Sequence, residues 1–383
     1  MGAEGSGLVD GGVTAEGAGA GGAGAGGAAV GGAAAGGMAA GGAGADGTGA
    51  DGTGGSDAVR EQEAREITGE LGGFVLARGE VDRASARRDD PGWVDAAWAD
   101  GRSRVLVLDD GQALIRFGDD GAELVLVPPA RAPAGVRFLL GTGDGGTAYF
   151  GVAGPPGVLG AGPLPPPGTD MPVPEAGVRP ASLRQAATLL GDRDAGLFTH
   201  AVALANWHAR HTHCPRCGAL TVPAPAGHMR RCPVDGSEHF PRIDPAVIML
   251  VTDDEDRCLL ARNRMWPPGR VSILAGFVEA GESAEQTVAR EVWEETGITV
   301  SGVRYVGSQA WPMPQSLMLG FRADAGHGQQ ITVDDEEIAE ARFLSRAELA
   351  AEVAAGALLL PPPVSIAHQI IQAWYGAPLP GTW

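Results

Sequence analysis

The chain has 383 residues, a formal net charge of −19 and no lysine, so its basic residues are all arginine. Such an acidic chain on average repels the phosphate backbone of nucleic acids, which argues against a non-specific DNA- or RNA-binding protein. Four cysteines in a chain of this length do not make a disulfide scaffold. Three of them cluster, which favours a metal site in a reducing compartment.

The first 57 residues are mostly glycine and alanine, with GAGAGGAGAGGAA as their core. This tract has no large side chains to bury and cannot offset the entropy of ordering, so we expect residues 1–57 to be a disordered tail. It lacks the basic start and the leucine-type core of a signal peptide, and nowhere do 18 large apolar residues run together. We therefore expect a soluble, cytoplasmic protein with no membrane partner.

The region 58–210 is expected to be a β-rich N-terminal domain with two trailing helices. Short alternating runs such as RVLVL and QALIRF are separated by the turn sequences DDG, DDG and DGG, which predicts antiparallel strands. A proline-rich linker follows at 155–175. The helices are expected around 181–191 and 194–211. The second helix carries a stripe at helical spacing, formed by Leu197, Ala201, Leu204 and His208.

A cysteine knuckle is expected at 211–241. CPRC and CPVD reproduce the spacing C-x₂-C…C-x₂-C, except that aspartate stands in the fourth position. Carboxylate and imidazole groups also bind zinc, so the fourth ligand is Asp235 or a nearby histidine, His239 or His213. The alternative is a knuckle that has lost its metal and is kept by packing. The predicted zinc ligands are Cys214, Cys217, Cys232 and Asp235.

The last block, 242–383, opens with the apolar run AVIMLV at 246–251, which predicts a buried strand, and Cys258 is expected to be buried in the apolar run CLLAR. Its strongest signal is AGFVEAGESAEQTVAREVWEETGI. Ser283 is the expected N-cap of a helix, with Gln286 closing a capping box and Gly297 as the C-cap glycine.

Helical spacing puts Glu291, Glu294 and Glu295 on one face of this helix, with Val288 and Val292 on a stripe that can face the core. Three neighbouring carboxylates repel one another unless a cation neutralises them, and hard oxygen donors suit Mg²⁺ or Mn²⁺. Cleavage of a diphosphate needs such ions. The alternative is an ordinary solvated acidic face.

The full spacing resembles the Nudix box without departure, from Gly276 through Glu282 to R-E-V-x-E-E-x-G-I. The resemblance implies an α/β/α sandwich that hydrolyses a nucleoside diphosphate linked to another moiety. It also implies that two or three divalent ions bind Glu291 and Glu295, with Glu294 a ligand or the base that activates water. The carbonyl of Ala275 completes the metal shell, and Arg290 orients the glutamates by ion pairing.

The stretch SQAWPMPQS, 308–316, is too rich in proline for a helix or a central strand, which predicts a rigid loop. Such a loop binds a flat ring at low entropic cost; the alternative is that Trp311 belongs to the core. The stretch resembles S-Q-P-W-P-F-P-x-S of the NADH pyrophosphatases, the NudC type, with alanine and methionine in place of one proline and the phenylalanine. The predicted substrate-binding residues are Gln309, Ala310, Trp311, Pro312, Met313, Pro314, Gln315 and Ser316.

The resemblance covers roughly residues 180–383 and implies further contacts. Arg184 matches a basic substrate contact, Phe240 an aromatic residue that stacks on the substrate, and Ala367 a backbone contact. Glu337 matches a further metal-binding glutamate; its alternative is a solvated acidic turn beside Asp334, Asp335 and Glu336.

We therefore expect an α+β protein: a C-terminal Nudix α/β/α sandwich, preceded by the zinc-ribbon-like knuckle and a β-rich, Nudix-like N-terminal domain. The expected reaction is hydrolysis of NADH or NAD⁺ to nicotinamide mononucleotide and AMP, by a homodimer with its sites near the subunit interface. The alternatives are removal of an NAD cap from RNA 5′ ends, and a different substrate such as ADP-ribose or a diadenosine polyphosphate. A more distant alternative is a zinc-knuckle nucleic-acid-binding protein with an inactive Nudix fold.

Overall fold

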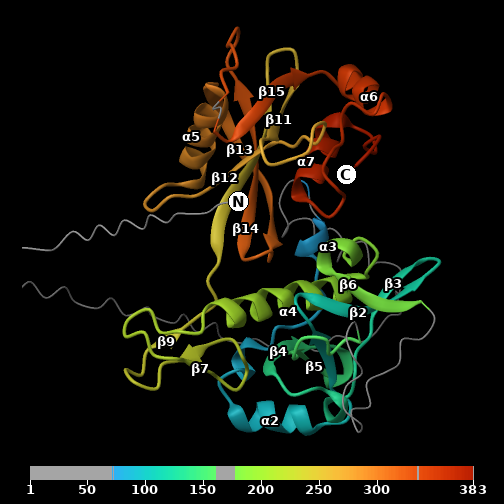
Figure 1. Ribbon diagram of the computed structural model, residues 1–383, viewed down its shortest axis with the longest axis vertical. Coiled ribbons are helices and arrows are strands. Elements are labelled where there is room, and N and C mark those ends of the chain that lie inside the picture. The colour runs from blue at the N-terminus through green and yellow to red at the C-terminus, as the bar shows by residue number, and fades with distance from the viewer. Residues whose placement is uncertain (1–70, 72, 161–176, 334–335, 383) are drawn as a thin grey trace, which may run out of the picture. The chain divides into compact units, whose positions relative to one another are not determined.

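The computed structural model describes residues 71, 73–160, 177–333 and 336–382 (Figure 1). These residues all belong to one compact unit, Thr53–Trp383. The tail expected at 1–57 and most of the expected proline-rich linker lie outside the described residues. Within the described ranges, no helix combines the length and the apolar character needed to cross a membrane.

The N-terminal part builds two three-stranded sheets, with strand orders β1-β5-β4 and β3-β2-β6. The expectation of antiparallel strands is wrong for one pair, because β1 and β5 are parallel. After β1 the chain turns away to build β2 and β3 in the second sheet, and it returns through β4, so β5 runs along β1 in the same direction. The elements are η1 (Val75–Ala77), η2 (Ser85–Arg87), α2 (Pro91–Ala99), β1 (Arg104–Leu108), β2 (Gln112–Gly118), β3 (Gly121–Leu124), η3 (Pro129–Arg131), β4 (Val136–Thr142), η4 (Asp144–Gly146), β5 (Ala148–Ala153) and β6 (Val178–Ser182).

Two helices follow, α3 (Leu183–Ala186) and α4 (Asp192–Arg210). The first is shorter than the expected 181–191. After it the chain forms a turn whose carbonyls at Ala187 and Leu190 accept from the Arg78 guanidinium, at 2.7 and 3.2 Å. The second confirms the expected helix. The four residues of its predicted stripe are all buried: Leu197, Ala201, Leu204 and His208.

The knuckle after α4 is a small antiparallel sheet in the order β7-β8-β9. Its strands are β7 (Val222–Pro223), β8 (Arg230–Arg231) and β9 (Glu238–His239).

A six-stranded sheet forms the centre of the C-terminal part, in the order β13-β14-β10-β11-β15 with β12 paired to β10. Helix α5 covers one face of this sheet and α7 lies over the other (Figure 1), which confirms the α/β/α sandwich. The elements are β10 (Asp244–Thr252), β11 (Cys258–Asn263), β12 (Leu274–Phe277), α5 (Ala284–Thr296), β13 (Val300–Trp311), β14 (Ser316–Ala325), β15 (Ile338–Leu344), α6 (Arg346–Ala354) and α7 (Ile366–Tyr375).

Alternation along β10 explains the two faces. Val247 and Met249 pack with Val288 and Val292 of α5, whereas Ile248 packs with residues of α7 on the opposite face. The whole run 246–251 is buried, as its apolar sequence predicts, and Cys258 of β11 is buried as well.

Helix α5 begins and ends where its sequence predicts. The Ser283 hydroxyl accepts from the amide of Gln286, whose side chain in turn accepts from the Ser283 amide, so the capping box is present. Gly297 ends the helix at φ 68°, the left-handed conformation that favours glycine.

A segment that precedes the N-terminal sheets is built into the C-terminal core. Phe74 has no exposed surface and belongs to the same cluster as Ile366 and Ile370 of α7. The amide of Leu71 donates to the carbonyl of Val306 in β13 at 3.1 Å. The core of the C-terminal part is therefore completed by residues from far upstream.

The stretch 308–316 is not the loop that its prolines suggest. Residues 308–311 end β13, Ser316 opens β14, and the turn is confined to 312–315. Both prolines of the stretch lie inside that turn, where no ladder hydrogen bond is required of them, so they do not interrupt the strands. The stretch is the tip of a β-hairpin.

Candidate active site

Arg290 ties the acidic helix to the loop before it. Its guanidinium makes two bonds to Glu282, at 2.9 and 3.0 Å. It also donates to Glu291 at 3.0 Å and to Glu294 at 2.8 Å. Pairing with Arg290 lowers the pKa of Glu282 to about 2, so this carboxylate is ionised at neutral pH. The ion pairing expected of Arg290 is present.

Gly276 leaves the space that the Glu291 carboxylate fills. A Cβ atom at position 276 would lie 1.8 Å from the Cδ of Glu291. Burial raises the pKa of Glu291. The hydrogen bond and charge of Arg290 act in the opposite direction, whereas the charges of Glu294 and Glu337 raise this pKa further. An oxygen-binding cation beside this side chain would favour its ionised form.

A cleft of about 780 Å³ collects the residues predicted to bind metal. Its lining comes from β10, β12, the loop after β12, α5, β14 and the segment before β15. The predicted metal-binding residues that line it are Ala275, Glu291, Glu294, Glu295 and Glu337. Of the neighbours named beside Glu337 in the acidic turn, Asp334 and Asp335 lie outside the described residues.

The donors in this cleft suit a hard divalent cation, because they are carboxylate and carbonyl oxygens. Their oxygen atoms do not form a close cluster. Among the described residues, the one group of three or more histidine, cysteine or acidic side chains whose ligand atoms lie within 4.8 Å of one another is in the knuckle. In the cleft, oxygens of Glu291 and Glu294 are instead bonded to Arg290.

Three of the side chains that line the cleft form a row from strand to strand. Ala246 of β10 lies opposite Phe277 of β12 and Met318 of β14, so all three point to the same face. Gly276, one residue earlier, faces α5, so the row lies on the face away from that helix. Phe277 at its end is 59% exposed and offers a flat apolar surface.

Ser316 is the predicted substrate contact that lines this cleft. Gln309, another predicted substrate contact, is buried: its oxygen accepts from the amide of Leu76 at 3.1 Å, and its nitrogen donates to the carbonyl of Val364 at 3.1 Å. Gln315 donates to Asp244 at 2.8 Å. These two amides brace the hairpin and do not face the cleft.

The tip of the hairpin is held by helices of the N-terminal part. The Arg184 guanidinium carbon lies 4.9 Å from the ring centre of Trp311, and its Nε lies 3.3 Å from the sulfur of Met313. Asn206 of α4 donates to the carbonyls of Pro312 and Pro314, at 2.6 and 3.4 Å. Sequence reasoning missed Asn206, because nothing in its local pattern distinguishes it from a solvated polar residue.

The remaining predicted contacts lie elsewhere. Ala310 is half-buried in β13. Phe240 is 66% exposed after β9 and is not part of the cleft lining. Ala367 is buried in the first turn of α7, where its amide donates to the Ser365 hydroxyl at 3.2 Å.

Sequence reasoning missed four residues that line the cleft: Ala246, Phe277, Trp293 and Met318. Alternation along β14 could have pointed to one of them, because Met318 lies two residues after Ser316.

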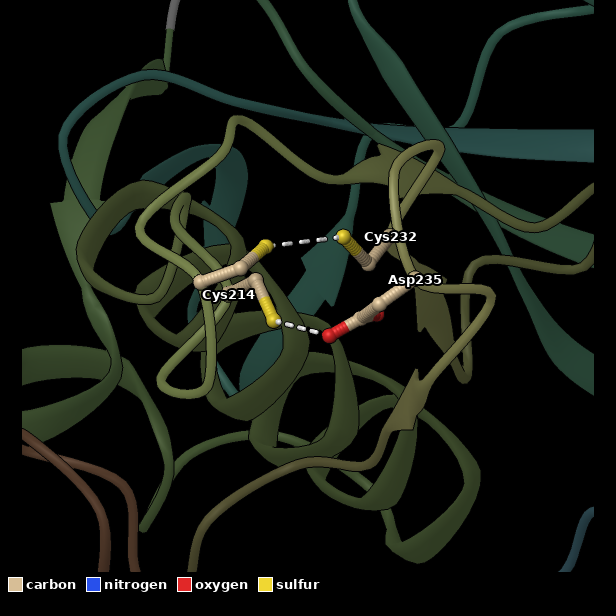
Figure 2. Close-up of side chains that lie close together, drawn as sticks. Cys214, Cys232 and Asp235 are labelled. Carbon is tan, nitrogen blue, oxygen red and sulfur yellow. Dashed lines mark hydrogen bonds between the residues drawn. The ribbon is translucent and has the colours of Figure 1, made fainter.

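The knuckle brings the four predicted zinc ligands together (Figure 2). The Sγ atoms of Cys217 and Cys232 are 3.4 Å apart, and Cys214 Sγ is 3.6 Å from Asp235 Oδ2. The alternative ligand His239 lies 3.0 Å from the Ser237 hydroxyl. Three sulfurs and one carboxylate oxygen within 4.8 Å of one another fit a tetrahedral zinc ion.

Comparison with known proteins follows the same division of the chain. Residues 242–360 match the Nudix domain, and residues 209–240 match the NADH pyrophosphatase zinc ribbon domain. The chain is 42% identical over 315 residues to a protein of Mycobacterium tuberculosis named NAD-capped RNA hydrolase NudC, a match that covers 78% of this chain and 94% of that protein. This chain belongs to the NudC group of Nudix hydrolases.

Other similarities cover less of the NudC-type chain. It is 41% identical over 197 residues to the human NAD-capped RNA hydrolase NUDT12, covering 48% of this chain and 42% of that protein. A crystal structure of a Nudix hydrolase from Nitrosomonas europaea is 23% identical, with a TM-score of 0.32, and covers 36% of this chain and 79% of that one. The family resemblance stated from the Nudix box and SQAWPMPQS is confirmed by the mycobacterial relative.

Proposed function

We propose that this NudC-type hydrolase cleaves the central diphosphate of NADH or NAD⁺ to give nicotinamide mononucleotide and AMP. The observation that carries the proposal is one cleft lined both by the glutamates of the Nudix box and by Ser316 and Met318 of the hairpin. A substrate whose diphosphate lies at the glutamates can therefore place a ring against the hairpin side.

In the proposed reaction a water oxygen bonds to one phosphorus, and the bond from that phosphorus to the bridging oxygen breaks. Glu291, Glu295, Glu337 and the carbonyl of Ala275 would hold two or three Mg²⁺ or Mn²⁺ ions. When bound, these ions neutralise the phosphates and acidify water. Glu294 is a further ligand or accepts the proton of the attacking water. Arg290 is a positioning residue, since its guanidinium is committed to carboxylates.

The row of Ala246, Phe277 and Met318 suits a flat, weakly polar ring. Ala246 in its centre leaves room, while the two larger side chains flank it. Arg184 and Asn206 contribute to this ring-binding surface indirectly, because they hold the turn of the hairpin to which Met318 belongs. We propose that nicotinamide lies there and that Trp311 supports the hairpin.

For the knuckle we propose a structural zinc on Cys214, Cys217, Cys232 and Asp235. The protein is proposed to act in the cytoplasm, and the family resemblance supports the proposal that it is a homodimer.

A second candidate substrate is an RNA that carries an NAD cap at its 5′ end. It is supported by the printed names of the relatives from Mycobacterium tuberculosis and human, both called NAD-capped RNA hydrolase. The bond to be cut is the same. The net charge of −19 disfavours tight binding of the RNA body.

The test is product analysis with NADH, ADP-ribose and NAD-capped RNA in Mg²⁺ or Mn²⁺, using wild type and Glu295→Gln. Formation of AMP and reduced nicotinamide mononucleotide by the wild type, lost in the variant, supports the proposal. Cleavage of ADP-ribose but not of NADH would instead show that the enzyme is specific for a substrate other than the dinucleotide. An inactive wild type would return the inactive Nudix fold to consideration.

A further inference from the structure

We propose that Trp293 forms a second base-binding subsite, which stacks on the adenine of the AMP half of the substrate. This inference rests on the proposed function and extends it to the part of the cleft that helix α5 lines. Trp293 lines the cleft together with the Nudix glutamates and is 59% exposed.

The helix does not need this side chain for packing. Helix α5 has its own apolar stripe, in which Val288 and Val292 have no exposed surface. Trp293 lies off that stripe, one turn after Arg290 and directly before the carboxylates of Glu294 and Glu295. A large exposed apolar side chain inside a cleft points to a ligand more than to the core.

The lining of the cleft comes from both faces of the sheet. Phe277, Ala246 and Met318 point to the face away from α5, whereas Gly276 abuts Glu291 on the α5 side. The glutamates and Ala275 line the same cleft as both of these groups. A dinucleotide has one nucleoside on each side of its diphosphate, so a diphosphate held there sends one base towards the hairpin and the other towards Trp293.

The chemistry around Trp293 favours a neutral flat ring. Its acidic neighbours Glu294 and Glu295 repel a phosphate when no cation is bound, but they do not repel a base. The cation one turn earlier, Arg290, is bonded to carboxylates. An indole stacks on any nucleobase, and such contacts are worth about 1–3 kcal/mol by alanine substitution. Because the hairpin is assigned to nicotinamide, the base at Trp293 is adenine.

The experiment compares Trp293→Ala, Trp293→Phe and wild type on two substrates. One is NADH; the other is an analogue in which nicotinamide mononucleotide is joined through the diphosphate to ribose 5-phosphate and adenine is absent. The matched control is Met265→Ala, which removes a side chain that is 88% exposed and does not line the cleft. Binding of AMP in Mg²⁺ is measured separately by calorimetry.

For Trp293→Ala we expect KM for NADH to rise about tenfold with kcat within about twofold, a change of about 1.4 kcal/mol. Trp293→Phe should recover most of the loss, and the adenine-free analogue should be turned over equally by wild type and Trp293→Ala. An unchanged KM for NADH, an equal loss on both substrates, or a shift to monomers would overturn the subsite. If wild type does not cleave NADH, the proposed function fails, and the AMP titration alone decides: tenfold weaker binding to Trp293→Ala supports the subsite, and equal binding refutes it.

Discussion

The backbone of Gly276 lies directly against the carboxylate of Glu291. A Cβ on that glycine would be 1.8 Å from Glu291 Cδ and 1.9 Å from its Oε1. The same carboxylate is bonded to Arg290 at 3.0 Å, so it is held between a strand and a guanidinium. The glycine of the Nudix box is thus required by the position of a proposed metal ligand.

Replacing this glycine should impair catalysis without unfolding the protein. In Gly276→Ala the Glu291 side chain must move, and we expect kcat/KM for NADH to fall about 10- to 100-fold, as when the support of a metal ligand is lost. The matched control is Gly101→Ala, where the added methyl would meet nothing within 4 Å. Equal activity of the two variants in a steady-state assay would contradict this role of Gly276.

The hairpin should loosen when Asn206 is changed. Asn206→Leu removes the donor that bonds the carbonyls of Pro312 and Pro314. Loss of a partner for partly buried carbonyls costs about 1–3 kcal/mol. Because the hairpin carries Ser316, we expect KM for NADH to rise more than kcat falls. Asn206→Gln, which keeps the amide, should lie between wild type and Asn206→Leu; a loss confined to thermal stability would argue for packing alone.

Zinc content should depend on Asp235. In Asp235→Ala we expect zinc affinity to fall at least about 10- to 100-fold, the loss seen even for outer partners of ligands. Asp235→Cys, which completes four thiolates, should hold zinc more tightly than wild type, since soft sulfur ligands favour zinc. Metal analysis after dialysis against a graded chelator measures both. Equal zinc retention by wild type and Asp235→Ala would assign the fourth ligand to another residue.

The protein should lose stability in mild acid through three histidines of α4 and the knuckle: His200 and His208, which are buried, and His228, which is half-buried. Burial lowers the pKa of His208 and of His228 to about 4; hydrogen bonds to the carbonyls of Gly227 and Leu139 oppose this shift, and the charges of nearby arginines add to it. Burial also lowers the pKa of His200, with Arg83 contributing.

The unfolded chain takes up protons near pH 6.5 while these histidines stay neutral in the fold. Unfolding free energy should therefore be highest above pH 6.5 and fall between pH 6.5 and 4, by up to about 1.4 kcal/mol per pH unit for each histidine. Denaturant titrations across this range measure the slope. His228→Gln, which can still donate to the carbonyl of Leu139, should flatten it, and an unaltered slope would exclude His228 as a contributor.

Local sequence rules predict α5 well, because its signals are all close in the chain. Ser283, Gln286 and Gly297 fix its ends, and Val288 and Val292 fix its buried face. The gathering of the glutamates in one cleft follows from the same helical spacing and from the family resemblance. The contribution of Glu337 comes from a distant segment, so only the resemblance could point to it.

The hairpin residues were harder to predict, since their roles depend on partners far away in sequence. Gln309 has the residue type of a substrate contact, but its amide is used by Leu76, 233 positions upstream, and by Val364. Arg184 matches a family contact, yet here it lies over Trp311. No local sequence pattern indicates which polar side chains will be used for hydrogen bonds within the folded protein.

The burial of Phe74 among the residues of α7 bears on how such proteins can be cut and recombined. A fragment that starts at residue 242 contains every strand of the central sheet but leaves the place of that ring empty and the Gln309 oxygen without its Leu76 donor. The sequence boundary of the Nudix domain is therefore not a boundary of its core. A transplanted Nudix domain would therefore have to include the short upstream segment that contains Phe74 and Leu76.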